Sequence, residues 1–176
     1  MKNIIITASI SLLLFSCGSS FQGFYNNHKT DMSATSFQVP NFMKAVLSNL
    51  SPEALNNIGN ISDFKFIKFE NINYLKSQSL ISEMNAVTKN GYIDVFRKNE
   101  PDNTRIISVR EVGIVVTDVI IFNSSAKETA AYYLQGNFNP DKIKSFADEE
   151  TFNTFSKDLI QSYQSNINPS FNPDSE

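Results

Sequence analysis

Alternating apolar and polar residues predict the strands of this protein. The clearest run is DFKFIKFE at 63–70, where the alternation slips between Phe66 and Ile67 and so predicts a β-bulge. A shorter strand covers Ala34–Val39 and stops at Pro40, which cannot donate a backbone hydrogen bond to a sheet. Four further strands follow one another closely and are predicted at 92–98, 104–111, 114–123 and 129–136.

Other stretches repeat apolar residues at helical spacing. They predict one helix around Phe42–Leu50, a second from about 72 to 89, and a third that opens at Pro140 and continues to about 163. The second helix ends at Asn90-Gly91, because glycine accepts the left-handed conformation that is common just after a helix.

The order of these elements is strand, helix, strand, helix, four strands, helix. Short connectors between the last four strands require antiparallel neighbours, and the apolar face of a sheet must be covered by another layer. The sequence therefore predicts an α+β fold, a two-layer sandwich of one largely antiparallel sheet of about five to six strands with helices packed on one face. The order of the strands stays open, with a ferredoxin-like arrangement among the possibilities.

The first residues have the form of an export signal. Lys2 precedes an apolar stretch, Ile4–Phe15, which as a helix would be only about 18 Å long. The hydrocarbon core of a bilayer is roughly 30 Å thick. A membrane-spanning helix is therefore disfavoured, and a cleaved signal peptide is favoured.

Leu14-Phe15-Ser16-Cys17, at the end of that stretch, resembles a bacterial lipobox. The resemblance implies that signal peptidase II cleaves between Ser16 and Cys17 and that the Cys17 thiol carries a diacylglycerol group. The alternative is an ordinary secretory signal with an incidental cysteine, although no small-x-small cleavage site precedes Cys17. The predicted division is a lipoprotein signal peptide at 1–16, a lipid anchor and tether at 17–33, a single α+β domain at 34–165 and a disordered tail at 166–176.

Composition narrows the classes of function. The 15 basic and 18 acidic residues give a net charge of -3, which disfavours a nucleic-acid partner. One cysteine and one histidine exclude internal disulfides and most zinc or imidazole chemistry. The chain also lacks the common catalytic and nucleotide-binding motifs. We therefore predict no catalytic residue, no metal and no cofactor.

Two carboxylates within apolar strands are the candidates for catalysis. Asp94 and Asp118 would approach one another if they shared a sheet face, and two carboxylates about 5–9 Å apart are the minimum of a glycosidase. Alternation with their neighbours instead favours the solvent face for both residues. His28 falls in the predicted tether, where we expect it to be exposed to solvent.

Other charged and aromatic residues have simpler structural explanations. Asp148-Glu149-Glu150 opens a helical segment, where acidic residues complement the helix dipole, and its spacing does not support a calcium site. The basic residues expected on a solvated sheet face with acidic cross-strand partners are Lys65, Lys68, Arg97, Lys98, Arg105 and Arg110. Core packing explains most of the strand aromatics, and the alternative is that those pointing outward form a docking surface. These aromatics are Phe37, Phe64, Phe66, Phe69, Tyr92, Phe96, Phe122, Tyr132 and Tyr133.

Several stretches resemble a known family. TSFQVP at 35–40, FKFIKFE at 64–70 and LQGNFNPDKI at 134–143 are similar to an uncharacterised group of small Bacteroidetes lipoproteins, known only as a domain of unknown function of the DUF4252 type. The similarity covers roughly residues 22–148. In its closing turn the family usually has Gly-x-Ile/Leu-Asp, where this chain has Gly136-Asn137-Phe138-Asn139. The resemblance implies an exported, often lipid-anchored domain, and it carries over no catalytic residue.

These observations predict a non-enzymatic binding or interaction module, anchored to membrane lipid through acylated Cys17, with an envelope protein or a glycan as its partner. Residues 18–27 contain no acidic residue, which favours the periplasmic side of the outer membrane over the cell surface. Two alternatives stay open. One is an enzyme or enzyme accessory that uses sheet carboxylates, and the other is a structural envelope protein that needs no ligand.

Overall fold

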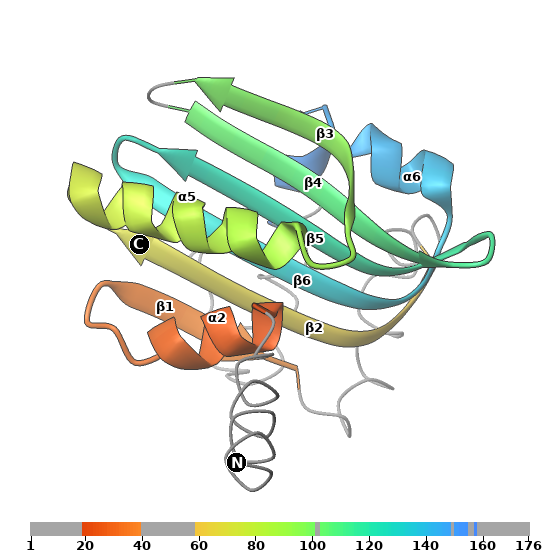
Figure 1. The fold of residues 1–176 in the computed structure, drawn as a ribbon, viewed down its shortest axis with the longest axis horizontal. Coiled ribbons are helices and arrows are strands. Elements are labelled where there is room, and N and C mark those ends of the chain that lie inside the picture. The colour runs from red at the N-terminus through yellow and green to blue at the C-terminus, as the bar shows by residue number, and fades with distance from the viewer. Residues whose placement is uncertain (1–18, 40–58, 101–102, 149, 155–156, 158–176) are drawn as a thin grey trace, which may run out of the picture.

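The protein folds around one curved antiparallel sheet (Figure 1). The computed structural model describes residues 19–39, 59–100, 103–148, 150–154 and 157. Within these residues the sheet has six strands in the order β1-β2-β6-β5-β4-β3, and every neighbouring pair is antiparallel. The predicted α+β class with one antiparallel sheet is confirmed. The strands are β1 (Ala34–Gln38), β2 (Gly59–Glu70), β3 (Ile93–Glu100), β4 (Asn103–Val112), β5 (Val115–Ser125) and β6 (Glu128–Phe138).

The chain reaches the two edges of the sheet by different routes. Strands β3 to β6 form the predicted meander, in which each strand pairs with the next along the chain. Helix α5 (Tyr74–Thr88) instead carries the chain from β2, near one edge, across the sheet to β3 at the far edge. Strand β2 then pairs with β6, so the first and last long strands of the domain lie side by side.

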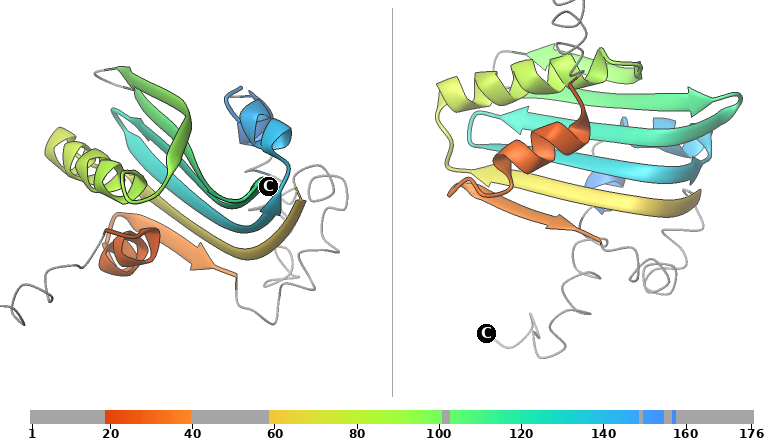
Figure 2. Two further views of the ribbon diagram at one scale, coloured as in Figure 1. Left: turned by 45° about the vertical axis from the view of Figure 1, so that its right-hand side comes forward. Right: turned by 60° about the horizontal axis from the view of Figure 1, so that its bottom comes forward.

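Helices lie on both faces of the sheet, whereas the sequence predicted them on one (Figure 2). Helices α5 and α2 (Phe21–His28) pack on what we call the α5 face, and α6 (Pro140–Ser145) packs in the concave opposite face, the α6 face. The core on the α5 face is formed by Phe21, Phe24, Tyr25, Ile67, Phe69, Leu80, Met84, Val87, Ile106, Ile120, Phe122 and Ala131. The core on the α6 face includes Phe64, Phe66, Ile107, Val109, Val119, Ile121, Leu134, Phe138, Ile143, Phe146 and Phe152.

Burial on both faces explains the irregular alternation in β2. Phe66 belongs to the core of the α6 face and Ile67 to the core of the α5 face. The pairing of β2 with β1 and with β6 continues through both residues without a register shift, so the predicted bulge there is wrong. The shift in β2 lies at Ile61/Asp63 instead. Further shifts in β4 and β5 lie at the same end of the sheet, where the strands curl around α6.

The predicted tether at 17–33 is wrong for its central part, because Phe21–His28 forms helix α2. Ser20 caps this helix, since its hydroxyl accepts a hydrogen bond from the Gly23 N–H at 3.1 Å. The helix buries Phe21, Phe24 and Tyr25 against the sheet. The folded domain therefore begins well before the predicted boundary at Ala34.

The third predicted helix is interrupted. Helix α6 ends at Ser145, and the chain is helical again at 150–154, where Asp148 caps the new turn by accepting the Thr151 N–H at 2.8 Å. The predicted helix around Phe42–Leu50, the tail at 166–176, and Ser16 and Cys17 lie outside the described residues. In the part of the chain that the structure describes, no helix is long and apolar enough to cross a membrane.

Candidate ligand-binding pocket

Each face of the sheet has an apolar half beneath a helix and a polar half beside it. Strand β4 shows the arrangement most clearly. Ile106 and Ile107, in its middle, are fully buried on opposite faces. Arg105 pairs with Asn123 towards one end of the sheet on the α6 face, and Arg110 pairs with Asp118 at the other end on the α5 face. The polar halves of the two faces therefore lie at opposite ends of the sheet.

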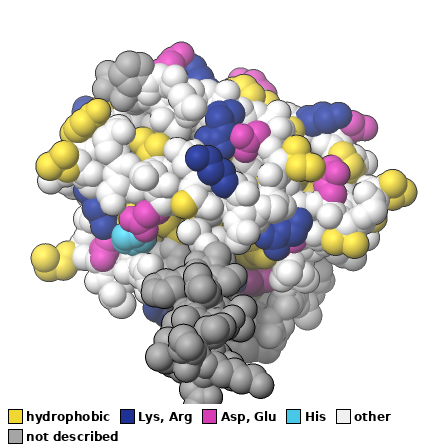
Figure 3. Space-filling view, in the orientation of Figure 1, with side chains coloured by type: hydrophobic (Ala, Val, Ile, Leu, Met, Phe, Trp, Pro, Cys, Tyr) yellow, Lys and Arg dark blue, Asp and Glu magenta, His cyan; other side chains and the backbone are white. Residues whose placement is uncertain are grey.

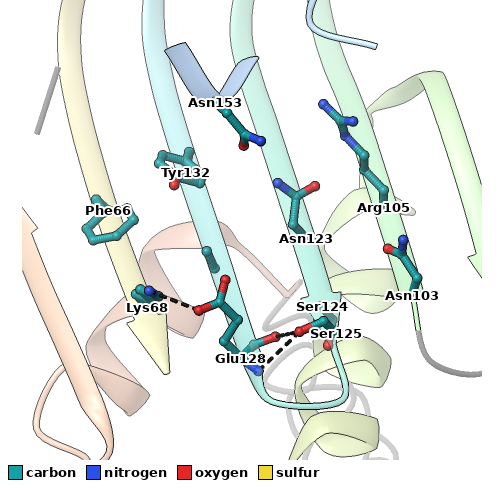
Figure 4. A pocket seen from close by; sticks show the side chains of 11 residues that line it. Phe66, Lys68, Asn103, Arg105, Asn123, Ser124, Ser125, Glu128, Tyr132 and Asn153 are labelled. Atoms are coloured by element: carbon teal, nitrogen blue, oxygen red, sulfur yellow. Dashed lines mark hydrogen bonds and ion pairs between the residues drawn. The ribbon is translucent and has the colours of Figure 1, made fainter. Parts of the chain in front are cut away.

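A pocket of about 310 Å³ occupies the polar half of the α6 face (Figure 4). Its wall is made by strands β2, β4, β5 and β6 and by the helical turn that carries Asn153. Sequence reasoning did not find this site. The residues that line it are Phe66, Lys68, Asn103, Arg105, Asn123, Ser124, Ser125, Glu128, Ala130, Tyr132 and Asn153.

The charges at one end of the pocket neutralise each other. The Lys68 ammonium lies 2.8 Å from a Glu70 carboxylate oxygen and 3.0 Å from one of Glu128. Hydrogen bonds to Glu70 and then to Glu128 raise the pKa of Lys68 above its ordinary value, although partial burial opposes the shift. This is the cross-strand pairing that the sequence predicted for a basic residue of the sheet. It fixes the Glu128 side chain at the edge of the pocket (Figure 4).

Arg105 is buried and joins the pocket wall to the segment that follows α6. Its guanidinium donates a hydrogen bond to the Phe146 carbonyl at 2.6 Å and lies 5.7 Å from the centre of the Phe152 ring. The expectation of a solvated side chain is wrong for this residue, since it is only 7% exposed. The charge is accommodated by carbonyl oxygens and aromatic faces.

Asn123 presents a buried acceptor in the centre of this wall. Its Oδ1 atom has no hydrogen-bond partner among the described residues. In Figure 4 the amide nitrogen of Asn123 points towards Asn153 across the pocket, whereas Oδ1 lies on the side of Arg105. Leaving a buried acceptor unpaired costs about 1–3 kcal/mol. A hydroxyl or amide that enters the pocket would recover that free energy by donating to Asn123.

The two candidate carboxylates lie on the α5 face, away from this pocket. Asp94 is exposed as predicted and accepts hydrogen bonds from Arg97 and Ser108, each at 2.6 Å. Burial opposes a fall in its pKa, but these two hydrogen bonds outweigh burial and hold the pKa of Asp94 below its ordinary value.

Asp118 is buried, so its predicted place on the solvent face is wrong. It accepts a hydrogen bond from the Tyr133 hydroxyl at 2.5 Å and another from Thr117 at 2.8 Å. Burial, together with the hydrogen bond to Asp118, raises the pKa of Tyr133 and keeps the phenol protonated as a donor. Neighbouring side chains thus take the place of solvent around Asp118.

His28 is buried as well, contrary to its expected exposure in a tether. Its Nδ1 lies 3.0 Å from Asp31 and its Nε2 lies 2.8 Å from Glu83 of α5. Lys76, also of α5, donates to Asp31 at 2.8 Å. The four side chains connect α2 and the turn after it to α5, which indicates a structural role.

The remaining predicted surfaces are divided between the two faces. By their register, Lys65, Arg97 and Arg110 belong to the α5 face, whereas Lys68, Lys98 and Arg105 belong to the α6 face. Lys65 is buried, so the expectation of a solvated side chain is wrong for it as well. A single basic face is therefore not formed. None of the nine strand aromatics is exposed, which agrees with core packing and not with the alternative of an outward docking patch.

Among the described residues, no three His, Cys, Asp or Glu side chains gather closely enough to hold a metal ion. A family model described as "Domain of unknown function (DUF4252)" matches residues 25–146. The chain belongs to this DUF4252 family. The resemblance to the DUF4252 domain seen in the sequence is thereby confirmed. No curated protein and no solved structure matches the chain. The DUF4252 match covers all the strands that form the pocket wall and ends before Asn153.

Proposed function

We propose that this protein is an exported, lipid-anchored binding module of the cell envelope, which holds a hydroxyl-rich ligand such as a glycan in the pocket on the α6 face without transforming it. The observation that carries the proposal is the buried Oδ1 of Asn123, a residue of the pocket wall, because this acceptor has no partner among the described residues. An acceptor in this position selects a ligand that brings hydrogen-bond donors.

The rest of the lining suits a glycan. Neutral amides and hydroxyls come from Asn103, Asn123, Asn153, Ser125 and Tyr132, while Lys68 and Glu128 largely neutralise each other. Amide side chains both donate and accept, as the adjacent hydroxyls of a sugar also do. A few placed polar groups around an aromatic floor are typical of small-ligand sites.

The distribution of carboxylates supports binding without chemistry. Among the described residues that line the pocket, Glu128 is the one carboxylate, and it is held by Lys68. Hydrolysis of a glycosidic bond requires a second carboxyl group across the bond. Asp94 and Asp118 lie on the other face of the sheet and are engaged with Arg97 and Tyr133.

The anchoring part of the proposal is supported by the sequence of residues 1–17 and is tested through Cys17. Wild-type and Cys17→Ala proteins are expressed with a clickable palmitate analogue, fractionated, and exposed to protease in intact cells. We expect label, outer-membrane partition and protection from protease for the wild type, and loss of the label for the variant. An unlabelled wild type would contradict lipid anchoring, and digestion in intact cells would place the protein on the cell surface.

The binding part is tested with purified protein on an array of immobilised oligosaccharides. Asn123→Leu keeps the side chain's size and removes the acceptor, so we expect a loss of affinity of up to about tenfold, equivalent to about 1.4 kcal/mol. Asn99→Leu, at an exposed position of β3 outside the pocket, is the matched control and should bind as the wild type does. Unchanged binding by Asn123→Leu would contradict the assigned site. A wild type that binds no oligosaccharide would favour a structural envelope role.

A further inference from the structure

The chain is held in place from Ser19 onwards. The Ser19 carbonyl accepts a hydrogen bond from the Asn90 side-chain amide at 3.1 Å, in the turn after α5. Phe21, two residues later, is 3% exposed, and its ring stacks on Tyr133 at 5.2 Å between centroids. Ser19 therefore marks a fixed point on the α5 face of the folded domain.

This fixed point limits the freedom of a lipid anchor at Cys17, on which the present inference rests. Two residues of fully extended chain span at most about 7 Å. The acyl group on Cys17 would therefore leave the domain within that distance of Ser19, whereas a flexible tether over 17–33 would have let the domain turn freely. The short connection keeps the part of the α5 face around Ser19 close to the membrane surface.

The surface around Ser19 has the chemistry of a lipid-headgroup contact. Arg110 donates to the Asn90 carbonyl at 3.2 Å, and its guanidinium lies 4.4 Å from the centre of the Tyr92 ring. Lys89, next to Asn90, is exposed. Neither Lys89 nor Arg110 makes an ion pair with a described residue. Basic side chains attract anionic headgroups, and tyrosine favours the membrane–water interface.

The acidic residues near this surface are already engaged. Asp94 is paired with Arg97, and Asp118 is buried beneath Tyr133. By its register with Val116, Glu111 falls on the α6 face. Figure 3 shows Lys and Arg side chains across the middle of the α5 face, some of them beside Asp or Glu side chains. The charges left available around Ser19 are therefore positive.

We propose that Lys89, Asn90, Tyr92 and Arg110 form a membrane-contact surface that rests on the phosphate groups of anionic lipids, and that this contact directs the pocket on the α6 face away from the bilayer. Lys89 and Arg110 bind the phosphates, and Tyr92 lies at headgroup level. The anchor thereby sets the orientation of the domain and leaves the pocket open to the envelope space.

The absence of tryptophan from the chain allows a direct test. A single tryptophan is introduced as Tyr92→Trp at the proposed contact or as Lys142→Trp on α6, an exposed position on the other face. The acylated proteins are reconstituted in vesicles of phosphatidylethanolamine and phosphatidylglycerol with brominated acyl chains. We expect strong quenching for Tyr92→Trp and little for Lys142→Trp.

Two changes made in the Tyr92→Trp background sharpen the test. Reversing charge with Lys89→Glu and Arg110→Glu should reduce the quenching to the level of Lys142→Trp, and so should a twelve-residue Gly-Ser insertion between Gly18 and Ser19. Equal quenching of both reporters, or quenching that neither change reduces, would overturn the proposed orientation of the domain but not its lipid anchor. Mass spectrometry of the purified protein separates the two proposals, because absence of the acyl mass would overturn the anchored function as well.

Discussion

The polar halves of the two faces are built from the same strands, yet one is hollow and the other is filled. On the α6 face the wall includes the short side chains of Asn103, Asn123 and Ala130, and a pocket results. On the α5 face large side chains occupy the corresponding half. Tyr133 donates to Asp118, and Arg110 stacks on Tyr92. Side-chain size thus separates a hollow polar surface from a filled one within a single sheet.

The largest expected effects come from the apolar halves, which should be equally important on both faces. Phe69 on the α5 face and Phe64 on the α6 face are both fully buried. Phe69→Ala and Phe64→Ala should each lower the free energy of unfolding by about 3–5 kcal/mol, because each leaves a cavity the size of a ring. Urea unfolding followed by circular dichroism measures both values.

Hydrogen exchange shows whether the two faces respond separately. The Phe69 ring lies 6.4 Å from Phe24 and 5.6 Å from His28, between ring centroids. Phe69→Ala should therefore speed amide exchange in α2, whereas Phe64→Ala should leave α2 protected. If both variants expose the same amides, the two halves of the core unfold as one unit and the comparison fails.

The filled polar half depends on its buried hydrogen bonds. Tyr133→Phe removes the hydroxyl that donates to the buried Asp118 carboxylate at 2.5 Å. We expect the free energy of unfolding to fall by about 1.5–3 kcal/mol, since hydrogen bonds to charged groups are the stronger ones. In a double-mutant cycle with Asp118→Asn, the double variant should lose less than the sum of the single losses. Additive losses would mean that the two groups are not coupled.

A substitution in the open polar half, on the α6 face, should have the opposite effect on stability. Asn123→Leu removes a buried acceptor that has no partner among the described residues, so we expect the free energy of unfolding to rise by about 1 kcal/mol. The same variant should bind the ligand more weakly, which is the trade-off expected of a binding site. A clear loss of stability in thermal unfolding would show that Asn123 serves packing instead.

The sequence predicted the individual helices and strands well. It predicted less well which side chains are buried and which distant strands become neighbours. Turn residues such as Asn90-Gly91 delimit the strands and α5 closely, because glycine there adopts a φ of 80°. The spacing of Phe21, Phe24, Tyr25 and His28 is i, i+3, i+4, i+7, with Ser20 as a cap, and this pattern would have predicted α2. Interpreting the segment as a tether hid that signal.

The pocket could not be predicted from the sequence, because it depends on which strands become neighbours. Lys68 and Glu128 are sixty residues apart, and they meet because β2 pairs with β6. The meander fixes the order of β3 to β6 through short turns, but α5 lets β2 join either edge. The burial of Asp118 depends instead on a contact within the meander, since Tyr133 of the neighbouring strand β6 donates to it.

The smallest predicted effect concerns the four side chains that hold α2 on the α5 face, which we call the clamp: His28, Asp31, Lys76 and Glu83. Asp31 accepts hydrogen bonds from Lys76 and His28, which hold its pKa below the ordinary value of 3.8. Folding therefore weakens proton binding by Asp31. Its contribution to stability is complete above pH 3.8 and is lost as the pH falls through the lower pKa of the folded protein.

Asp31→Asn should consequently lower the free energy of unfolding by only about 0.5 kcal/mol at pH 7, since the ion pair is partly open to solvent. The difference from the wild type should shrink in urea unfolding curves as the pH falls below 3.8. Asp141→Asn on α6 is the matched control. Its side chain is 87% exposed and 3.6 Å from Lys144, so no measurable effect is expected at any pH. A pH-independent loss in Asp31→Asn would assign the clamp to hydrogen-bond geometry instead of charge, and α2 would then stay docked on the α5 face in acid.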